Sequence, residues 1–238
     1  MKVFIGCSGW NYKDWRGKFY PEKLAQKNWL EFYAKEFNTV EVNNTFYRFP
    51  RDSSLLSWKD TAPEGFRFTL KGSRYVTHMK KLKEVSESVD NFHNAAALLE
   101  EKLSCILWQL PPNLHRNDEK LKGFCETLNP ADKNVIEFRH LSWFDSEVYS
   151  LLSKYGVSFC SISSPEFPDD MITTSEIGYV RFHGEGKNWY DYYYAQEQLE
   201  KWHHKILKSG VKEVYVYFNN DIGANAVENA KQLKGMFN

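Results

Sequence analysis

Acidic, basic and imidazole side chains recur at the ends of short apolar runs, in pairs that leave one apolar residue between their members. Residues two apart in a β-strand point to the same face, so each pair would present both polar groups on one side of a sheet. A carboxylate or imidazole in such a place can transfer a proton, and a guanidinium can hold an anion. The pairs are Glu41 with Asn43, Glu137 with Arg139, and Arg181 with His183.

These pairs supply the candidates for catalysis. Glu41 and Glu137 could act as acid and base, or as the carboxylate pair of a glycosidase. Arg139 would hold anionic charge, and His183 would be a proton carrier or a ligand. A structural ion pair between Glu137 and Arg139 is the competing interpretation. The predicted catalytic residues are Glu41, Glu137, Arg139 and His183.

Other polar and aromatic residues lie at or near the ends of the remaining apolar runs, and aromatics make up 16% of the chain. Basic side chains there would hold anionic charge, amides would orient a substrate, and aromatic rings would form stacking walls. The predicted substrate-binding residues are Trp10, Asn43, Tyr47, Lys71, Gln109, His140, Trp143, Arg181, Tyr190, Asn219 and Asn220.

Two segments, 183–190 and 219–223, follow the last two apolar runs, and the second opens a predicted helix. Loops of this kind beside a helix N-terminus commonly bind anions in α/β barrels, so we expect an anionic ligand, especially a phosphate. A divalent metal on Glu41, Glu137 and His183 is the weaker hypothesis, because about three cations share their face. We therefore assign no metal ligands, and no motif for an organic cofactor is present.

Eight β-rich runs and the helical patterns between them must position these residues. Such alternation predicts parallel βα units, and the C-terminal ends of their strands would meet at one mouth. Amphipathic stripes predict helices over 24–37, 85–103, 119–128, 146–155, 196–208 and 224–236. The runs cover 3–7, 39–42, 67–71, 104–110, 134–138, 157–162, 178–183 and 213–218.

The pattern predicts one TIM (β/α)8 barrel domain over residues 1–238. An open doubly wound sheet is the alternative, which the absence of a Gly-rich phosphate fingerprint after the first run disfavours. Segment 163–176 contains Pro165 and Pro168, so the sixth helix should be short or missing.

Charge and hydropathy restrict the partners. Lys and Arg number 31, as do Asp and Glu, so the net charge is zero and no polybasic arm indicates a nucleic acid or a membrane surface. No signal peptide or membrane span is predicted, and the four cysteines form no CxxC pair. We expect a cytoplasmic protein whose partner is an anionic or sugar-like small molecule, with no known protein partner.

Several longer motifs show a resemblance that covers the chain from Met1 to its end. The sequence resembles the YecE-like family, also called domain of unknown function 72, in Ser8-Gly9-Trp10, Glu41-Val42-Asn43-Asn44-Thr45, Gln109-Leu110-Pro111-Pro112, Glu137-Phe138-Arg139-His140, Arg181-Phe182-His183-Gly184 and Tyr217-Phe218-Asn219-Asn220-Asp221.

The resemblance implies a TIM barrel and leaves the activity open. It also implies a barrel similar to those of metal-dependent sugar isomerases and apurinic-site endonucleases. Relatives often have an acid after strand six, in a pattern like Asp-x-Pro. Ser163-Ser164-Pro165 stands there in this sequence, which implies altered chemistry.

We therefore hypothesise an enzyme, hydrolase- or lyase-like, acting on a phosphate- or sugar-containing ligand at the C-terminal mouth. A nucleic-acid-binding or phosphodiesterase-like protein is the first alternative, and zero net charge weighs against it. A non-catalytic small-molecule sensor is the second alternative.

Overall fold

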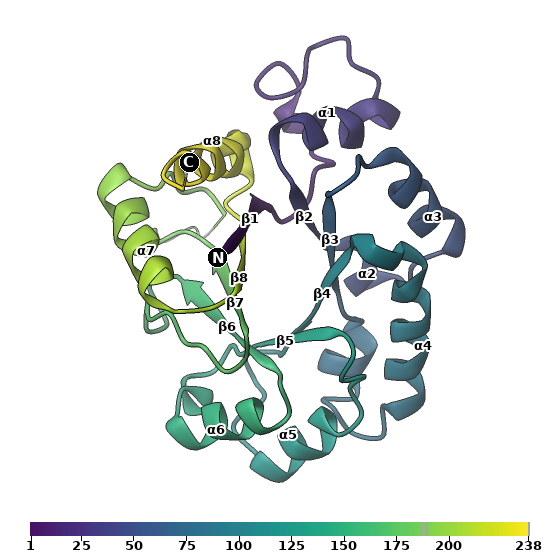
Figure 1. The fold of residues 1–238 in the computed structure, drawn as a ribbon, viewed down its shortest axis with the longest axis vertical. Coiled ribbons are helices and arrows are strands. Elements are labelled where there is room, and N and C mark those ends of the chain that lie inside the picture. Colours follow the sequence, from purple (N-terminus) through teal and green to yellow (C-terminus); the bar gives the residue numbers. More distant parts are fainter. Residues whose placement is uncertain (187, 189, 238) are drawn as a thin grey trace.

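Eight parallel strands form the centre of the molecule, and helices surround them (Figure 1). The computed structural model describes residues 1–186, 188 and 190–237. From β2 to β8, each strand pairs with its neighbours in sequence, and β8 also pairs with β1. The predicted TIM barrel is therefore confirmed. The strands are β1 Lys2–Cys7, β2 Thr39–Val42, β3 Arg67–Lys71, β4 Leu103–Gln109, β5 Lys133–Glu137, β6 Ser158–Ser163, β7 Ile177–Phe182 and β8 Glu213–Phe218.

Side chains close the barrel between β1 and β2. The buried hydroxyl of Tyr33 accepts a hydrogen bond from the backbone N–H of Cys7 at 2.7 Å and donates one to the carbonyl of Thr39 at 3.0 Å. The side-chain amide of Asn38 also donates to the carbonyl of Val3 at 3.1 Å. Tyr33 thus joins the two strands at the seam and satisfies backbone groups there.

The interior of the barrel has its own buried cluster, distinct from the core beneath the helices. The hydroxyl of Tyr217 lies 2.7 Å from the hydroxyl of Thr39 and 2.8 Å from that of Thr69, so these residues point inward from three strands. Because side chains alternate, Glu41 and Lys71 share this inner face two positions closer to the C-terminal mouth. The cluster comprises Cys105, Leu107, Val135, Cys160, Ile162, Ile177, Tyr179, Tyr215 and Tyr217.

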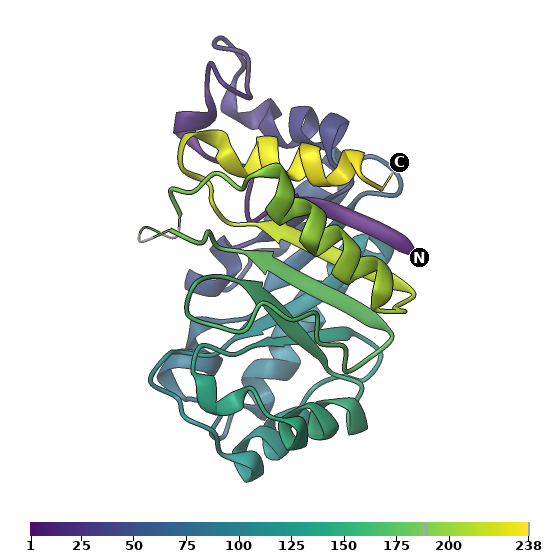
Figure 2. The same ribbon diagram turned by 90° about the vertical axis from the view of Figure 1, so that its left-hand side faces the viewer.

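Helices follow every strand except β6. As predicted, no helix forms between β6 and β7, where Pro165 and Pro168 lie. On the outside of the barrel, α7 and α8 run side by side (Figure 2). The helices are α1 Trp29–Glu36, α2 Asn44–Tyr47, α3 Asp52–Thr61, α4 Ser86–Ala96, α5 Asp118–Cys125, α6 Ser146–Lys154, α7 Gln196–Lys208 and α8 Asn225–Gly235.

The sequence patterns did not predict α2 and α3. In α3 only Leu55 is buried, so the helix lacks the apolar stripe by which the other helices were recognised. No helix in the described ranges is both long and apolar enough to cross a membrane.

Candidate functional site

Charged side chains from three strands form a hydrogen-bonded network inside the barrel, near its C-terminal mouth. Arg181 on β7 donates from Nη2 to Glu41 Oε1 on β2 and from Nη1 to Glu137 Oε2 on β5, each at 2.6 Å. The second oxygen of Glu41 accepts a hydrogen bond from the Tyr179 hydroxyl, also at 2.6 Å. All four side chains are almost fully buried. The sequence placed Glu41, Glu137 and Arg181 together at the mouth, and the structure joins them into one network.

Two further predicted residues complete this network. Arg139, directly beyond β5, donates from Nε to Glu137 Oε1. His183 Nε2 lies 3.2 Å from the same oxygen, and Asn219 Nδ2 lies 3.0 Å from His183 Nδ1. Nε2 also lies 3.1 Å from Arg139 Nη2, so this nitrogen contacts both an obligate donor and the carboxylate acceptor of Glu137. His183 is thus oriented from both sides.

The protonation states follow from these contacts. Burial opposes the charge on Glu137, but Arg139, Arg181 and the His183 hydrogen bond outweigh it and hold its pKa well below the ordinary value. Burial, helped by the charges of Arg139 and Arg181, lowers the pKa of His183 to about 3. Glu137 is therefore ionised and His183 neutral near pH ~7. Both oxygens of Glu137 are occupied, so its geometry suits anchoring of the arginines better than proton transfer.

Lys71 differs from its neighbours because its ammonium forms no hydrogen bond or ion pair within the described chain. Only 9% of the residue is exposed, and Nζ lies 4.5 Å from the centre of the Phe46 ring. Burial, reinforced by the charge of Arg181, lowers the pKa of Lys71 from 10.5 to about 7. Gly72 follows Lys71. A Cβ atom at this position would lie 2.2 Å from the Trp108 ring, so only glycine fits here.

The predicted amide residues fall into different environments. Asn43 donates to the carbonyl of Ser8 at 2.9 Å, and Gln109 lies partly exposed at the end of β4, paired with Glu137 in register. Asn220 instead donates to the carbonyl of Tyr192 and to Asn229, so it holds the segment before α7 against α8. Asn220 therefore has a structural role in place of the predicted substrate contact.

Several buried polar atoms at the strand ends have no hydrogen-bond partner in the described chain. Such atoms are costly unless water or a ligand satisfies them. They are Ser8 Oγ, Asn43 Oδ1, Ser164 Oγ, Arg181 Nε and Asn220 Oδ1, and all five are almost completely covered by protein atoms.

The predicted aromatic walls are only partly in position. Trp143 is fully buried, stacks on Phe138 and donates to the carbonyl of Leu114 at 2.7 Å, so it belongs to the core and was wrongly expected at an accessible wall. Trp10 is half-buried with its ring edge-on to Trp58. Tyr190 is 45% exposed.

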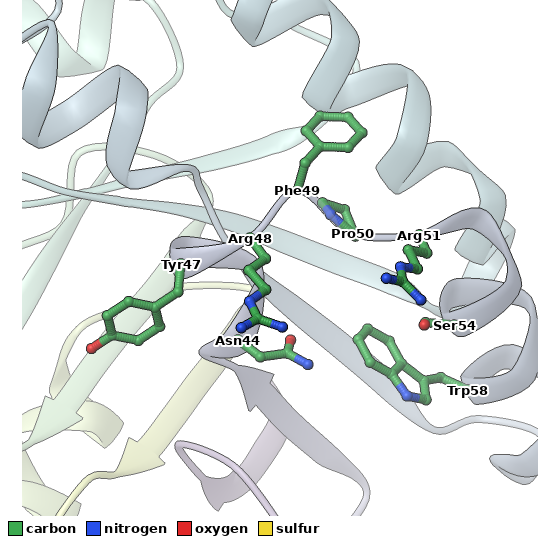
Figure 3. A pocket seen from close by; sticks show the side chains of 8 residues that line it. All are labelled: Asn44, Tyr47, Arg48, Phe49, Pro50, Arg51, Ser54 and Trp58. Atoms are coloured by element: carbon green, nitrogen blue, oxygen red, sulfur yellow. The ribbon is translucent and has the colours of Figure 1, made fainter.

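Tyr47 and His140 lie at the rim. Tyr47 is 71% exposed and lines a pocket of about 440 Å³ between α2 and α3 (Figure 3). Figure 3 shows the guanidinium groups of Arg48 and Arg51 and the indole of Trp58 around this pocket. His140 stacks on His115 with ring centres 3.9 Å apart.

The loops after β7 and β8 match the anion-site prediction poorly. Lys187 and Trp189 of segment 183–190 lie outside the described residues. In segment 219–223, the backbone N–H of Gly223 donates to a carboxylate oxygen of Asp14 at 3.0 Å. A carboxylate at this N–H does not favour an anion. A Cβ atom on Gly223 would lie 3.4 Å from Lys18 Nζ, whereas the cationic groups of the mouth, Lys71 and Arg139, lie at the ends of β3 and β5.

Glu185 was missed by the sequence reasoning. Ser163 Oγ donates to Glu185 Oε1 at 3.1 Å, so a carboxylate from the segment after β7 lies beside the serine that stands in place of the expected acid. No sequence spacing indicates this contact, because 22 residues separate the two. Tyr179 was also missed, although it precedes Arg181 by two residues and shares its face.

A metal centre has no ready ligand set among the described residues, since none of their His, Cys, Asp and Glu side chains gather in threes around one point. Glu137 and His183 do meet, but their contacting atoms already face Arg139 and Arg181.

Two known proteins are similar to this chain in sequence. The UPF0759 protein YunF of Bacillus subtilis is 28% identical over 97% of this chain and 93% of its own length. The UPF0759 protein YecE of Escherichia coli is 28% identical over 60% of this chain and 50% of its own length.

Among solved structures, a DUF72 family protein of Thermotoga maritima is 33% identical with a TM-score of 0.91, covering 100% of this chain and 99% of that one. One from Enterococcus faecalis, 22% identical with a TM-score of 0.85 over 98% and 94% of the two chains, shares the fold. The model for the family "Protein of unknown function DUF72" matches residues 4–238. The chain therefore belongs to the DUF72 family.

Proposed function

We propose that the protein is an enzyme, hydrolase- or lyase-like, that binds a phosphate- or sugar-containing small molecule at the C-terminal mouth of the barrel. One observation supports this most strongly. Arg139 keeps part of its side chain exposed above the buried network of Arg181, Glu41 and Glu137, and the amine of Lys71 has no acid partner among the described residues. An anion bound at the mouth would accept charge-assisted hydrogen bonds from Arg139.

The geometry also indicates which groups would contact the ligand. The two terminal nitrogens of Arg181 and both glutamates are engaged in the buried network beneath the mouth. Arg139 keeps 12% of its side chain exposed, and Lys71 keeps 9% of its surface exposed. Arg139 would therefore hold the anionic group, and Lys71 would face the rest of the ligand, with Asn43 and Gln109 beside them.

Isothermal titration calorimetry with inorganic phosphate, ribose 5-phosphate and ribose tests this proposal. Both phosphates should bind, and Arg139→Gln should weaken binding about tenfold or more, as expected for loss of a charge-assisted hydrogen bond. Arg67→Gln is the matched control, because Arg67 begins β3 at the opposite end of the barrel. Absence of phosphate binding, or equal loss in both variants, would refute the proposal. Binding without turnover across a panel of phosphoesters would favour a sensor.

A second candidate, nucleic-acid binding, is favoured by the rim pocket. Arg48 and Arg51 line it with Trp58, no carboxylate does, and the neighbouring Tyr47 and Phe49 are 71% and 53% exposed. Cations interleaved with exposed aromatic rings suit single-stranded nucleic acids. Fluorescence anisotropy with single- and double-stranded DNA at two salt concentrations tests it, with Arg48→Gln as the variant. Binding that is absent or insensitive to salt would exclude this candidate.

A further inference from the structure

We infer that the side-chain amine of Lys71 is a nucleophile that forms an imine with the carbonyl carbon of a phosphate-bearing aldehyde or ketone. This inference rests on the proposed function, because the mouth must first bind the anionic part of the same molecule.

Position is the first argument. Lys71 is the last residue of β3, two residues beyond Thr69, whose hydroxyl meets Tyr217 inside the barrel. The amine therefore points inward at the mouth from a rigid strand. Catalytic groups of barrels come from such strand ends, and rigid elements hold a reacting atom more precisely than loops do.

The second argument is that no neighbouring carboxylate is available to the amine. Glu41 is bonded to Tyr179 and Arg181, and Glu137 is bonded to Arg181 and Arg139. A structural lysine at this depth would be expected to pair with an acid, since buried charges are otherwise rarely tolerated. Here the acids that could have paired with it are committed to arginines.

Electrostatics then favours the neutral amine. Burial and the charges of Arg181 and Arg139 oppose the ammonium form, while Glu137 and Glu41 favour it less strongly, and the balance lowers the pKa of Lys71 to about 7. His78, also near this group, is neutral, because burial is the main cause that lowers its pKa to about 4. Desolvation beside another cation is a general way to activate a lysine nucleophile.

The chemistry balances without a further reactant. The nitrogen lone pair attacks the carbonyl carbon, and the carbonyl electron pair moves to oxygen, which gains a proton as the nitrogen loses one. The carbinolamine hydroxyl then takes up a proton and leaves as water while the nitrogen lone pair forms the C=N bond, and loss of the last N–H proton from nitrogen balances the proton taken up. The products are the imine and one water molecule. Protonated, the imine draws electrons from the adjacent bond, which is the step that a lyase requires.

Reductive trapping tests the inference on the intact protein. Wild-type protein is incubated with dihydroxyacetone phosphate and cyanoborohydride near pH ~7.5, and peptide mass mapping then locates the adduct. At this pH the neutral fraction of Lys71, whose pKa is about 7, exceeds that of an exposed lysine by several hundredfold, on the order of 10²–10³. One adduct, on Lys71, is expected. Dihydroxyacetone, which lacks the phosphate, should react more slowly, and glycerol 3-phosphate, which lacks the carbonyl, should protect.

The outcomes separate this inference from the proposed function. If phosphate binds but labelling is equal across surface lysines or absent, the imine inference is refuted and the binding proposal stands. If phosphate does not bind, the binding proposal fails as well. Lys71→Arg should abolish the single adduct while retaining a cation in the mouth. The wild-type peptide map decides the question even where this variant fails to fold.

Discussion

Replacing Lys71 by methionine should stabilise the protein at neutral and acidic pH. Methionine keeps an unbranched side chain of similar length beside Phe46 and removes the charge. In the unfolded chain the amine titrates near its ordinary pKa of 10.5, and in the fold near about 7. At about 1.4 kcal/mol per pKa unit, this difference corresponds to an upper bound of about 5 kcal/mol.

The sign of the stability difference between Lys71→Met and the wild type depends on which state holds the proton at each pH. Below pH ~7 both states hold the proton, and the folded state bears the full cost of the buried charge. Between about 7 and 10.5 the folded protein loses the proton before the unfolded chain does, so the cost declines. Above about 10.5 neither state is charged, and no difference should remain. The variant should therefore be more stable by a few kcal/mol at pH ~6, with the gain declining toward pH ~10.

Urea unfolding of the wild type and Lys71→Met at several pH values measures this directly. Lys23→Met is the control, because Lys23 is exposed and has no ion pair within the described chain. A variant that is less stable than wild type at pH ~6, or whose gain does not vary with pH, would refute the view of Lys71 as an unpaired buried amine.

Three further predictions concern the framework around this amine. Arg181→Gln should lower the free energy of unfolding by about 3–5 kcal/mol in urea titrations, because Glu41 and Glu137 would remain buried without their shared cation; a loss below about 1 kcal/mol would contradict the network. The imidazole of His183 should show no titration between pH ~5 and ~9 by nitrogen NMR, because burial lowers its pKa to about 3; a midpoint near 6 would contradict this. Tyr33→Phe should cost about 1–3 kcal/mol and speed amide exchange at the seam of β1 and β2; unchanged exchange would show that the hydroxyl does not close the barrel.

The sequence allowed the strands and the inner polar face to be predicted because alternation is a local property. Glu137 and Arg139 lie on one face for the same reason that Phe138 lies on the other, and the contacts agree, because Arg139 bonds to Glu137 while Phe138 stacks on Trp143. Elements without an apolar stripe could not be predicted in this way. Helix α3, which buries only Leu55, is the clearest example.

The pairing of polar groups depends on distances across the barrel. The spacing of residues along one strand does not indicate these distances. Sequence spacing suggested that Glu137 pairs with Arg139, which is correct, but not that Arg181 reaches Glu41 across 140 positions. Trp143 shows the same limit. It was predicted as a stacking wall near a strand end, whereas its indole lies in the core and donates to the carbonyl of Leu114.

The arrangement explains why a stable barrel would retain such a costly network. Arg181 binds both glutamates, so neither can neutralise Lys71, and the same guanidinium adds its own charge against the ammonium. A simple ion pair between Lys71 and Glu41 would cost less stability, but it would leave the lysine protonated and unreactive at neutral pH. In this arrangement the acids stabilise the arginines, while burial, reinforced by the charge of Arg181, lowers the pKa of Lys71 to about 7. The network thus leaves Lys71 without an acid partner, as the imine inference requires.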